Sequence, residues 1–477
     1  MNSLRLHPND NVEVLLQADG EIPAGHKIAV SSIKCSENVI KYGYPIGHAI
    51  RDIEPGEWVH SHNTATNLDG TLDYSRIEHG AAPFEPIPIA VTPDMQSFMG
   101  YEREDGRVGI RNELWILPTV GCVADVATRM ASEMSKKTRL KVRAFPHTFG
   151  CSQLGEDHAN TRQMLASLAM HPNAGGVLVL GLGCENNQAD ELKPFVQSSR
   201  VRYLITQDVE DELHEGLRIL SELASVAEQD ERTKQPISKL AVGLKCGGSD
   251  GFSGITANPL VGRLSDYVVA NGGTSVLTEV PEMFGAETIL MGRCIDKSVF
   301  DKTVALVNDF KDYYLSQGLP VGENPSPGNK EGGITTLEDK SLGCVQKGGT
   351  APVCDVIDYG HRTKSHGLNL LCAPGNDLVA STALAAAGCQ LVLFTTGRGT
   401  PFGTIVPTMK ISTNSILYER KPHWIDFDAG QLVRGAGFET MLPSLIRKVT
   451  DIANGEETKN ELNNYVGIAI WKNGVTL

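Results

Sequence analysis

Four turns rich in glycine and polar residues are the first candidates for chemistry in this sequence of 477 residues. They cover residues 118–122, 147–152, 181–187 and 245–250, and each follows a predicted strand. In open α/β sheets, ligands bind at the carboxyl ends of the strands, where glycine lets the backbone approach closely. The predicted catalytic residues come from two of these turns: His147, Lys245, Ser249 and Asp250.

Three of the turns also place a cysteine after a strand, at Cys122, Cys151 and Cys184. Three cysteines at neighbouring strand ends could hold an iron–sulfur cluster with one iron open to substrate, because cluster ligands need no close sequence spacing. Buried free cysteine is also a common packing residue. Both interpretations stay open for these cysteines.

A second group of candidates is histidine-rich and lies near the N-terminus. His60 and His62 are two residues apart, so both imidazoles would project from one face of a strand. Such a pair is a reasonable half of a divalent-metal site, completed by carboxylates or water. We predict His60, His62, His26 and Glu279 as metal ligands, with Glu282 as a further carboxylate candidate.

An arginine flanked by glycines is the third candidate, in the segment 396–399, Thr-Gly-Arg-Gly. Arginine binds carboxylates through a bidentate fork, and an open backbone adds amide donors. Arg111 is a weaker anion anchor, for which a surface ion pair is an equal alternative. The predicted substrate ligands are Thr396, Gly397, Arg398, Gly399, Asn186 and Arg111.

The elements that must position these residues follow from periodicity and turn signals. Short alternating strands over 1–70 predict a small β-rich module, and four prolines in 71–98 predict an extended linker. From 99 onward, strand and helix patterns alternate, which is typical of parallel sheets covered on both faces. The polar run 228–235 separates a Rossmann-like α/β domain (99–232) from a C-terminal α/β catalytic domain (233–477).

Finer expectations concern the chemistry-bearing segments. The sequence predicts a strand around His60 and His62, and a helix over 209–224. Residues 321–336 are rich in Gly, Pro and Asn, so they predict an irregular loop, and a loop of this length is usually functional.

Composition narrows the class of protein. The net charge of −14, from 43 basic and 57 acidic residues, disfavours nucleic acid or an anionic membrane as a partner. No apolar stretch approaches the ~20 residues of a membrane helix, and the first residues lack the pattern of a signal peptide. We therefore expect a cytoplasmic protein with free thiols and a small-molecule partner, and a homo-oligomer is compatible with this.

Long sequence blocks then resemble one family. RNELWILPTVGC, VLGLGCENNQ, CGGSDGFSGITANP, TEVPEMFGAE and TGRGTPFG are similar to the altronate and galactarate dehydratases, and the match runs from about residue 38 to the C-terminus. The resemblance implies an N-terminal SAF (β-clip) module and a hydro-lyase that removes water from D-altronate to give 2-dehydro-3-deoxy-D-gluconate. It also implies a divalent metal, Fe²⁺ or Mn²⁺, and a role in hexuronate breakdown.

The reaction sets the chemical requirements. Removing a proton next to a carboxylate needs a base and stabilisation of the developing negative charge, and the β-hydroxyl needs an acid to leave. Lys245 or His147 is the predicted base, while the N-terminal module is predicted to close over the α/β domain. The alternatives are dehydration of a related acid such as galactarate, an iron–sulfur dehydratase, and a non-catalytic sugar-acid binding protein. A nicotinamide dehydrogenase is disfavoured because no G-x-G-x-x-G follows an early strand.

Overall fold

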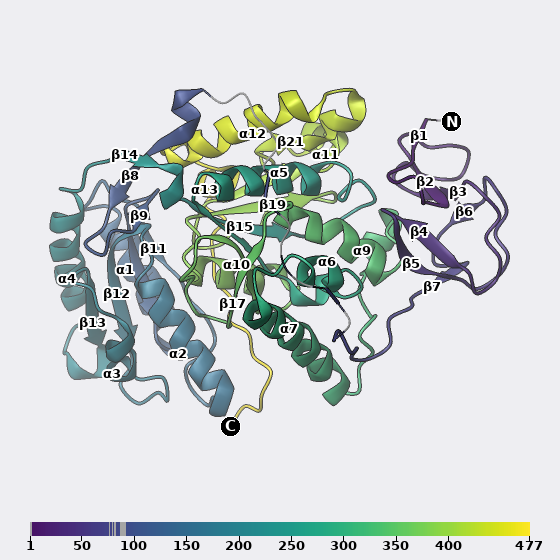
Figure 1. The fold of residues 1–477 in the computed structure, drawn as a ribbon. Coiled ribbons are helices and arrows are strands. Elements are labelled where there is room, and N and C mark those ends of the chain that lie inside the picture. The colour runs from purple at the N-terminus through teal and green to yellow at the C-terminus, as the bar shows by residue number, and fades with distance from the viewer. Residues whose placement is uncertain (1, 76, 79, 81–82, 86–91) are drawn as a thin grey trace.

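The computed structural model describes residues 2–75, 77–78, 80, 83–85 and 92–477. Three units lie in a row in Figure 1: the N-terminal strands at the right, a large α/β unit in the centre and a smaller α/β unit at the left. The two α/β units contain parallel sheets, and the N-terminal strands form a separate β module. This arrangement confirms the predicted fold class.

The N-terminal module consists of two small antiparallel sheets. One contains β1 (Ser3–Leu4), β2 (Val12–Leu15), β3 (Lys27–Ala29) and β6 (Trp58–Val59), and the other contains β4 (Asn38–Lys41), β5 (Tyr44–Ala49) and β7 (Thr64–Ala65). Alternate residues such as Val12, Val39, Ile46 and Val59 face a shared core and are almost fully buried. The alternation of apolar residues along the strands therefore produced the module.

The strand predicted around His60 and His62 is wrong, because β6 ends at Val59. The amide side chain of Asn63 accepts a hydrogen bond from the His60 backbone N–H (2.9 Å), and the Asn63 N–H donates to the His60 carbonyl (3.0 Å). Asparagine competes with strand pairing through such local bonds. The two histidines therefore lie in a turn, and the same-face argument does not apply to them.

The second domain is built on a four-stranded parallel sheet in the order β11-β10-β12-β13. Its strands are β10 (Glu113–Pro118), β11 (Val142–Ala144), β12 (Ala174–Gly181) and β13 (Val201–Ile205). Its helices are α1 (Ala124–Met134), α2 (Gly155–Ala169), α3 (Ala189–Leu192) and α4 (Glu212–Ala227). A small antiparallel sheet of β8 (Ser97–Glu102), β9 (Val108–Gly109) and β14 (Thr233–Pro236) frames this domain.

The C-terminal domain contains a seven-stranded, all-parallel sheet in the order β17-β18-β16-β15-β19-β20-β21. Its strands are β15 (Ala241–Cys246), β16 (Thr274–Leu277), β17 (Val353–Ile357), β18 (Gly367–Leu371), β19 (Leu391–Thr396), β20 (Thr408–Ser412) and β21 (Phe427–Asp428). Its helices are α5 (Ala257–Ala270), α6 (Glu287–Met291), α7 (Lys297–Ser316), α8 (Pro327–Glu331), α9 (Leu337–Cys344), α10 (Asp377–Ala386), α11 (Ser415–Arg420), α12 (Phe438–Ala453) and α13 (Lys459–Leu462).

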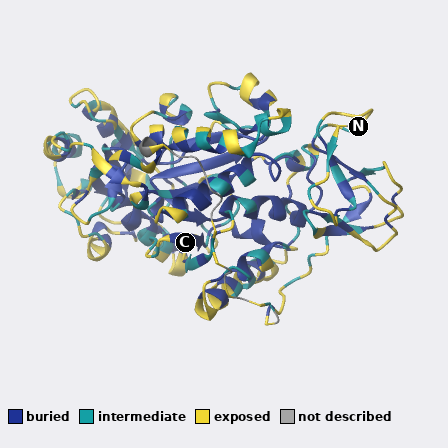
Figure 2. Cartoon of the chain, turned by 45° about the horizontal axis from the view of Figure 1, so that its top comes forward, coloured by how far each residue is buried: buried dark blue, intermediate teal, exposed yellow. Residues whose placement is uncertain are grey.

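The two faces of the large sheet belong to different cores. On one face, Leu244 and Leu393 pack with α5 and α12. On the other, Val392 and Phe394 pack with α10 and with Trp115 and other apolar residues of the second domain. The buried residues form a continuous dark layer through the centre of Figure 2. The second and C-terminal domains are therefore held together by a shared hydrophobic core.

Three finer expectations need correction. The helix predicted from residue 209 begins at Glu212, because Asp211 caps it by accepting the N–H of His214. The segment predicted to be irregular, 321–336, contains α8, whose capping box joins Ser326 and Asn329. Part of the predicted linker, 71–98, lies outside the described residues, and β8 already begins at Ser97.

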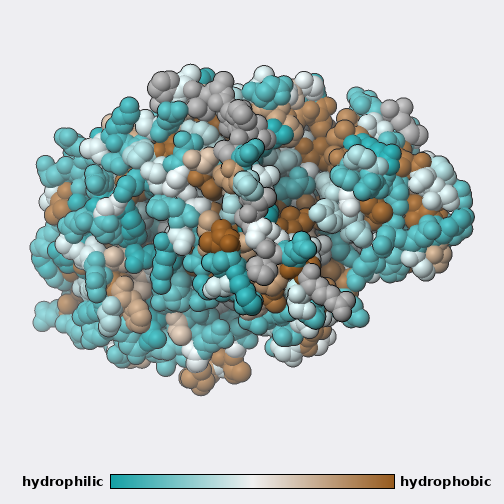
Figure 3. Space-filling view, viewed as in Figure 1, coloured by the Kyte–Doolittle hydropathy of each residue, from teal (hydrophilic) through white to brown (hydrophobic). Residues whose placement is uncertain are grey.

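Charged and polar side chains cover most of the face drawn in Figure 3, as expected from 43 basic and 57 acidic residues. Among the described residues, no helix combines the length and apolar character required to cross a bilayer.

The N-terminal module is attached to the C-terminal domain by buried charge. Asp339 of α9 lies between two buried ammonium groups, 2.7 Å from Lys27 Nζ and 2.9 Å from Lys41 Nζ. Burial alone would raise the pKa of Asp339, but the two lysines outweigh it and hold that pKa far below its usual range. At the same interface a Cβ on Gly251 would collide with the carbonyl of Gly25. Only glycine allows these two backbone segments to approach so closely.

Replacing Asp339 with asparagine should destabilise the protein by roughly 3–5 kcal/mol, because two buried ammonium groups lose their counter-charge. Urea denaturation at pH 7 measures the loss. In the wild type this contribution is present above the unfolded-state pKa of an aspartate and fades only as pH falls toward the depressed folded value. The exposed pair Lys34–Asp52 provides the control, since Asp52→Asn should leave the midpoint unchanged. Equal midpoints for the two variants would contradict the role of Asp339.

Candidate active site

Two thiols and a carboxylate meet at the carboxyl end of the large sheet. Cys246 ends β15, Glu282 lies in the 3-10 turn Val280–Met283 after β16, and Cys344 ends α9. The two sulfur atoms are 3.3 Å apart, and Glu282 Oε2 lies 3.2 Å from Cys246 Sγ and 3.1 Å from Cys344 Sγ. Among the described residues, this is the one group of three or more His, Cys, Asp or Glu side chains whose ligand atoms lie close enough to share a metal ion.

The charges around this group are arranged to hold it together. Lys340 Nζ lies 2.7 Å from the other oxygen of Glu282. Burial alone would raise the pKa of Glu282, but Lys340, Lys245 and Lys347 lower it far below its usual range, so the carboxylate stays ionised. The hydrogen bond from Cys246 and burial raise the pKa of the Cys344 thiol. The Cys344 thiol is therefore protonated in the metal-free protein, and a bound metal would replace its proton.

A buried carboxylate between two lysines adjoins the thiols. Glu279 accepts from Lys347 Nζ (2.7 Å), from the Cys246 N–H (3.0 Å) and from Lys245 Nζ. Its backbone is left-handed, with φ of 70°, which is a strained conformation for a residue with a side chain. Such strain persists only where surrounding contacts impose it, and it is concentrated at functional sites. Both carboxylate oxygens of Glu279 are thus ion-paired with lysines. Glu279 does not lie with the histidines of the N-terminal module.

Lys245 is an ammonium in this arrangement. Its Nζ contacts Glu279 and lies 2.9 Å from Asp377 Oδ1 at the start of α10. Burial alone would lower the pKa of Lys245, but Glu279 and Asp377 more than offset it and raise that pKa above its ordinary value. A group that keeps its proton so firmly serves better as a positive charge than as a base.

The histidines of the N-terminal module form an aromatic cluster around Trp58. The Trp58 ring is stacked on His60 (5.7 Å between ring centroids) and meets His26 and His62 edge-on at 5.3 and 5.5 Å. Both ring nitrogens of His26 are used: Trp58 Nε1 donates to Nδ1 at 3.2 Å, and Nε2 is 3.1 Å from the Glu331 carbonyl oxygen. No ring nitrogen of His26 is left for a metal.

His60 differs from His26 because it keeps a ring nitrogen without a partner among the described residues. Its Nδ1 lies 3.3 Å from Thr335 Oγ1 of the C-terminal domain. Burial, assisted by the positive charge of Lys27, lowers the pKa of His60 to about 4. The imidazole is therefore neutral at pH 7. His62 is exposed and packs only on the edge of Trp58.

The N-terminal module meets the strand-end turns predicted to bind substrate. Arg398 Nη2 pairs with Glu331 at 2.8 Å in an exposed position, and the Glu331 carbonyl is the partner of His26. The backbone N–H groups of Gly397 and Arg398 donate to the Gly248 carbonyl at 3.0 and 2.9 Å, and the Gly399 N–H donates to Thr396 Oγ1 at 2.9 Å. Only the Arg398 side chain therefore remains free to exchange its partner for an anion.

Asp250 and Ser249 lie at the same edge. Asp250 accepts from Thr413 Oγ1 (2.9 Å) and Asn414 Nδ2 (3.1 Å), and a Cβ on Gly397 would collide with its carboxylate. Burial raises the pKa of Asp250 in spite of these hydrogen bonds. Ser249 Oγ is buried without a hydrogen-bond partner among the described residues. A polar ligand atom or water would satisfy this hydroxyl.

The remaining predicted residues belong to the second domain, on the other side of the molecule from the N-terminal module (Figure 1). Arg111 is buried and makes a bidentate pair with Glu461 (2.7 and 2.9 Å), so it joins two domains. His147 is buried, with Nε2 2.8 Å from the Pro118 carbonyl. Asn186 accepts from the Ser152 N–H at 2.9 Å, which ties two turns together. The structure does not bring these three residues to the edge occupied by Cys246.

Cys122, Cys151 and Cys184 are exposed free thiols in the second domain. They follow β10, β11 and β12, which are neighbours in its sheet. They belong to a different sheet from Cys246 and do not contribute to the thiol–carboxylate group.

Sequence inspection missed one further residue, Lys410 on β20. It is buried, its ammonium lies 4.7 Å from the centre of the Phe394 ring, and Lys245 lies 5.5 Å from the same ring. No carboxylate among the described residues lies within ion-pair distance of its Nζ. Burial lowers the pKa of Lys410 to about 8, with partial compensation by Asp426 and Asp377. The alternating apolar pattern of 408–412 does not indicate a buried lysine without a carboxylate partner.

Comparisons with known proteins agree along the whole chain. Residues 1–67 match the altronate/galactarate dehydratase SAF domain, 100–228 the second domain of D-galactarate dehydratase/altronate hydrolase, and 237–476 the C-terminal domain of D-galactarate/altronate dehydratase.

A glycosyl transferase family 9 structure from Veillonella parvula covers 73% of this chain and 99% of its own at 8% identity, with a TM-score of only 0.18.

Curated relatives extend this match. Altronate dehydratase of Bacillus subtilis (strain 168) is 54% identical over 97% of this chain and 94% of its own length. Altronate dehydratase of Escherichia coli (strain K12) is 52% identical over 100% of both chains. The E. coli galactarate dehydratase (L-threo-forming) is 32% identical over 95% of this chain and 93% of its own. The resemblance seen in the sequence is confirmed, and the chain belongs to the altronate/galactarate dehydratase family.

Proposed function

We propose that this protein is a metal-dependent hydro-lyase that converts D-altronate to 2-dehydro-3-deoxy-D-gluconate and water. The observation that carries the proposal is the buried Cys246–Glu282–Cys344 group at the strand ends, in a chain of this family. Identity to altronate dehydratases above 50% favours altronate over galactarate, for which the relative is 32% identical. We place the reaction in the reducing cytoplasm, since all ten cysteines are free and four of them are exposed.

The donor set fits an iron(II) ion better than manganese. The two sulfur atoms are soft donors, which suit Fe²⁺ better than Mn²⁺, since Mn²⁺ prefers oxygen; the carboxylate is a hard donor that can bind either ion. The three ligand atoms lie within 4.8 Å of one another and come from three different elements, which leaves coordination positions open to substrate. A bound divalent ion would supply Lewis-acid stabilisation for the carboxylate and α-hydroxyl of the substrate.

The protein's own residues provide the charges and protons. Arg398 would release Glu331 and take the substrate carboxylate, while Lys245 offers a fixed positive charge near the developing enediolate. Lys410 is the base we favour, because it lies at the same Phe394 ring as Lys245 and burial lowers its pKa to about 8. Asp250, whose pKa burial raises, would hold the proton that the departing hydroxide needs. Neutral His60 and the unsatisfied Ser249 hydroxyl would bind hydroxyl groups of the sugar acid.

Removal of either thiol should remove the metal. In Cys246→Ala and Cys344→Ala, iron bound per chain after anaerobic loading should fall at least about tenfold, because two ligands cannot hold the ion as three can. Release of the 2-keto-3-deoxy acid should fall with it. Metal analysis by mass spectrometry and the product assay measure the two effects. Cys389→Ala is the matched control, a buried thiol outside the group.

The same samples test the iron–sulfur alternative. Acid-labile sulfide that accompanies the iron, survives in Cys246→Ala and disappears in Cys184→Ala would reject the mononuclear site. Iron without sulfide supports it.

Loss of Lys410 should remove the base without removing the metal. We expect kcat of Lys410→Met to fall about 10²–10⁴-fold, the usual contribution of general-base catalysis. In the wild type, kcat should rise with pH up to about 8, since the neutral amine forms as pH passes the lowered pKa. The variant should lose this rise while keeping its iron. Lys421→Met, at a half-buried lysine that packs on Trp424, is the control, and an unchanged pH profile in Lys410→Met would exclude the assignment.

His60→Ala separates substrate binding from metal binding at the N-terminal module. We expect KM for altronate to rise about tenfold, the worth of one good hydrogen bond, with bound iron unchanged. The comparison variant is His48→Ala, at a histidine whose Nδ1 lies 2.8 Å from Asn67 Oδ1 and which is not part of the aromatic cluster around Trp58. Loss of iron in His60→Ala or His62→Ala would instead support a metal site at these histidines.

A further inference from the structure

A large cavity opens at the opposite edge of the seven-stranded sheet from the thiol–carboxylate group. Its volume is about 820 Å³, a size typical of sites for small molecules. Ala241 and Thr274, the first residues of β15 and β16, contribute to its lining, as do residues 361–366 just before β18. None of the residues placed in the proposed reaction lines it.

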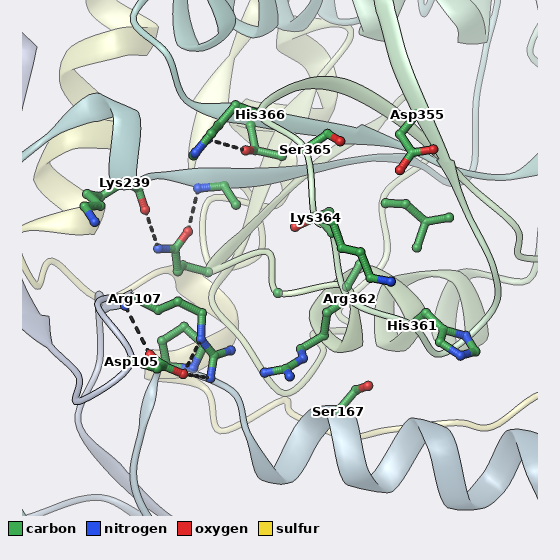
Figure 4. Close-up of a pocket in the computed structure, with 18 of the residues that line it drawn as sticks. Asp105, Arg107, Ser167, Lys239, Asp355, His361, Arg362, Lys364, Ser365 and His366 are labelled. Carbon is green, nitrogen blue, oxygen red and sulfur yellow. Dashed lines mark hydrogen bonds and ion pairs between the residues drawn. The ribbon is translucent and has the colours of Figure 1, made fainter. Parts of the chain in front are cut away.

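The cavity lies between two domains. The β8–β9 turn, with Asp105 and Arg107, and Ser167 of α2 form one wall, and Lys239, Asp355 and residues 361–366 form the other (Figure 4). The labelled side chains in Figure 4 come from both walls and surround a common space. A molecule bound here would contact the second and the C-terminal domain at once.

The cavity is basic, although the protein carries a net charge of −14. Five lysines and arginines line it against three aspartates. The basic residues are Arg107, Lys239, Lys302, Arg362 and Lys364, and the acidic ones are Asp105, Asp355 and Asp358. Two histidines, His361 and His366, add further donors.

Ion pairs within the cavity neutralise only some of its cations. Asp105 pairs with Arg107 (2.5 Å) and Asp355 with Lys302 (2.8 Å). Arg107 still has one nitrogen, Nη1, buried without a hydrogen-bond partner among the described residues. Among the residues that the structure describes, the side chains of Arg362 and Lys364 have no ion-pair partner. Burial and the neighbouring charge of Arg107 lower the pKa of Arg362, and Asp105 offsets part of this effect.

Cations without an ion-pair partner that converge on one cavity, here Arg362 and Lys364, are satisfied best by an anion with several oxygen atoms. Arginine matches carboxylate and phosphate in planar, bidentate geometry, and partial burial strengthens each contact. A single carboxylate could neutralise only one of the unpaired cations. The cavity therefore fits a small molecule that carries two or more negative groups.

We propose that this interdomain cavity is an effector site for a small organic polyanion, either a polycarboxylate or a phosphorylated sugar acid. β15 begins at the cavity with Ala241 and ends at the candidate metal ligand Cys246. The bound anion would fix the second domain against the strands that carry the active site. The site is separate from substrate binding, so its test does not depend on the proposed reaction.

Calorimetry with purified full-length protein tests the proposal at low ionic strength. Citrate represents the polycarboxylates, 6-phosphogluconate the phosphorylated acids, and gluconate serves as the monoanionic control. We expect saturable binding of citrate or 6-phosphogluconate below about 1 mM, weakened by salt, and at least about tenfold weaker binding of gluconate. The probe that binds more tightly shows whether the site prefers a polycarboxylate or a phosphorylated sugar acid. Bound anion should also raise the thermal midpoint in a concentration-dependent manner.

The double variant Arg362→Gln/Lys364→Gln localises the binding. Its affinity for the tighter probe should fall at least about tenfold, while its basal dehydratase activity and thermal midpoint without anion stay at wild-type values. Lys136→Gln, an exposed lysine of the second domain, is the matched control. The proposal is overturned if both polyanions fail to bind below about 10 mM. Unchanged affinity in the double variant also overturns it, because the anion would then occupy another site, such as that of the substrate.

Discussion

The cost of burying charge is the constraint on which this structure depends. Seven lysines are largely or fully removed from solvent, and an ammonium group can stay charged there only beside a carboxylate. Six of them have one: Lys27, Lys41, Lys245, Lys311, Lys340 and Lys347. Lys410 has none among the described residues. Five of the paired lysines belong to the interface or the site, whereas burial without a carboxylate partner lowers the pKa of Lys410 to about 8.

These ion pairs also explain how the N-terminal module and the C-terminal domain build one site. Asp339 holds the N-terminal module through Lys27 and Lys41, and Lys340, the next residue on α9, holds Glu282 beside the two thiols. One helix therefore fixes both the covering module and the candidate metal ligands. This coupling agrees with a module that closes over the strand ends, where water must be excluded during proton transfer.

We infer that the large sheet has two functional edges. Its carboxyl edge carries the thiols, Glu279 and the turn around Arg398, which is where parallel sheets usually bind substrate. Its amino edge carries the basic cavity between domains. Because the shared core around Trp115 and Phe394 fuses the second and C-terminal domains, a molecule wedged between them at one edge acts on strands that end at the other.

Local patterns in the sequence were sufficient for the fold class and the family. Alternating strand and helix periodicity predicted the parallel sheets, and the proline-rich segment after residue 70 separated the β module from them. Long motif blocks identified the altronate/galactarate dehydratases. These signals are local, because periodicity and turn residues reflect the conformation of each segment and the motifs are read one block at a time.

The composition of the site was decided by tertiary structure. Cys246 and Cys344 are 98 residues apart in sequence, and no spacing rule brings their sulfur atoms to 3.3 Å. His26 has the right chemistry for a metal, but Trp58 and the Glu331 carbonyl occupy its two nitrogens. Arg111 suits an anion, yet its partner is Glu461. A side chain's type is written in the sequence, whereas its partners depend on which distant segments the hydrophobic core packs beside it.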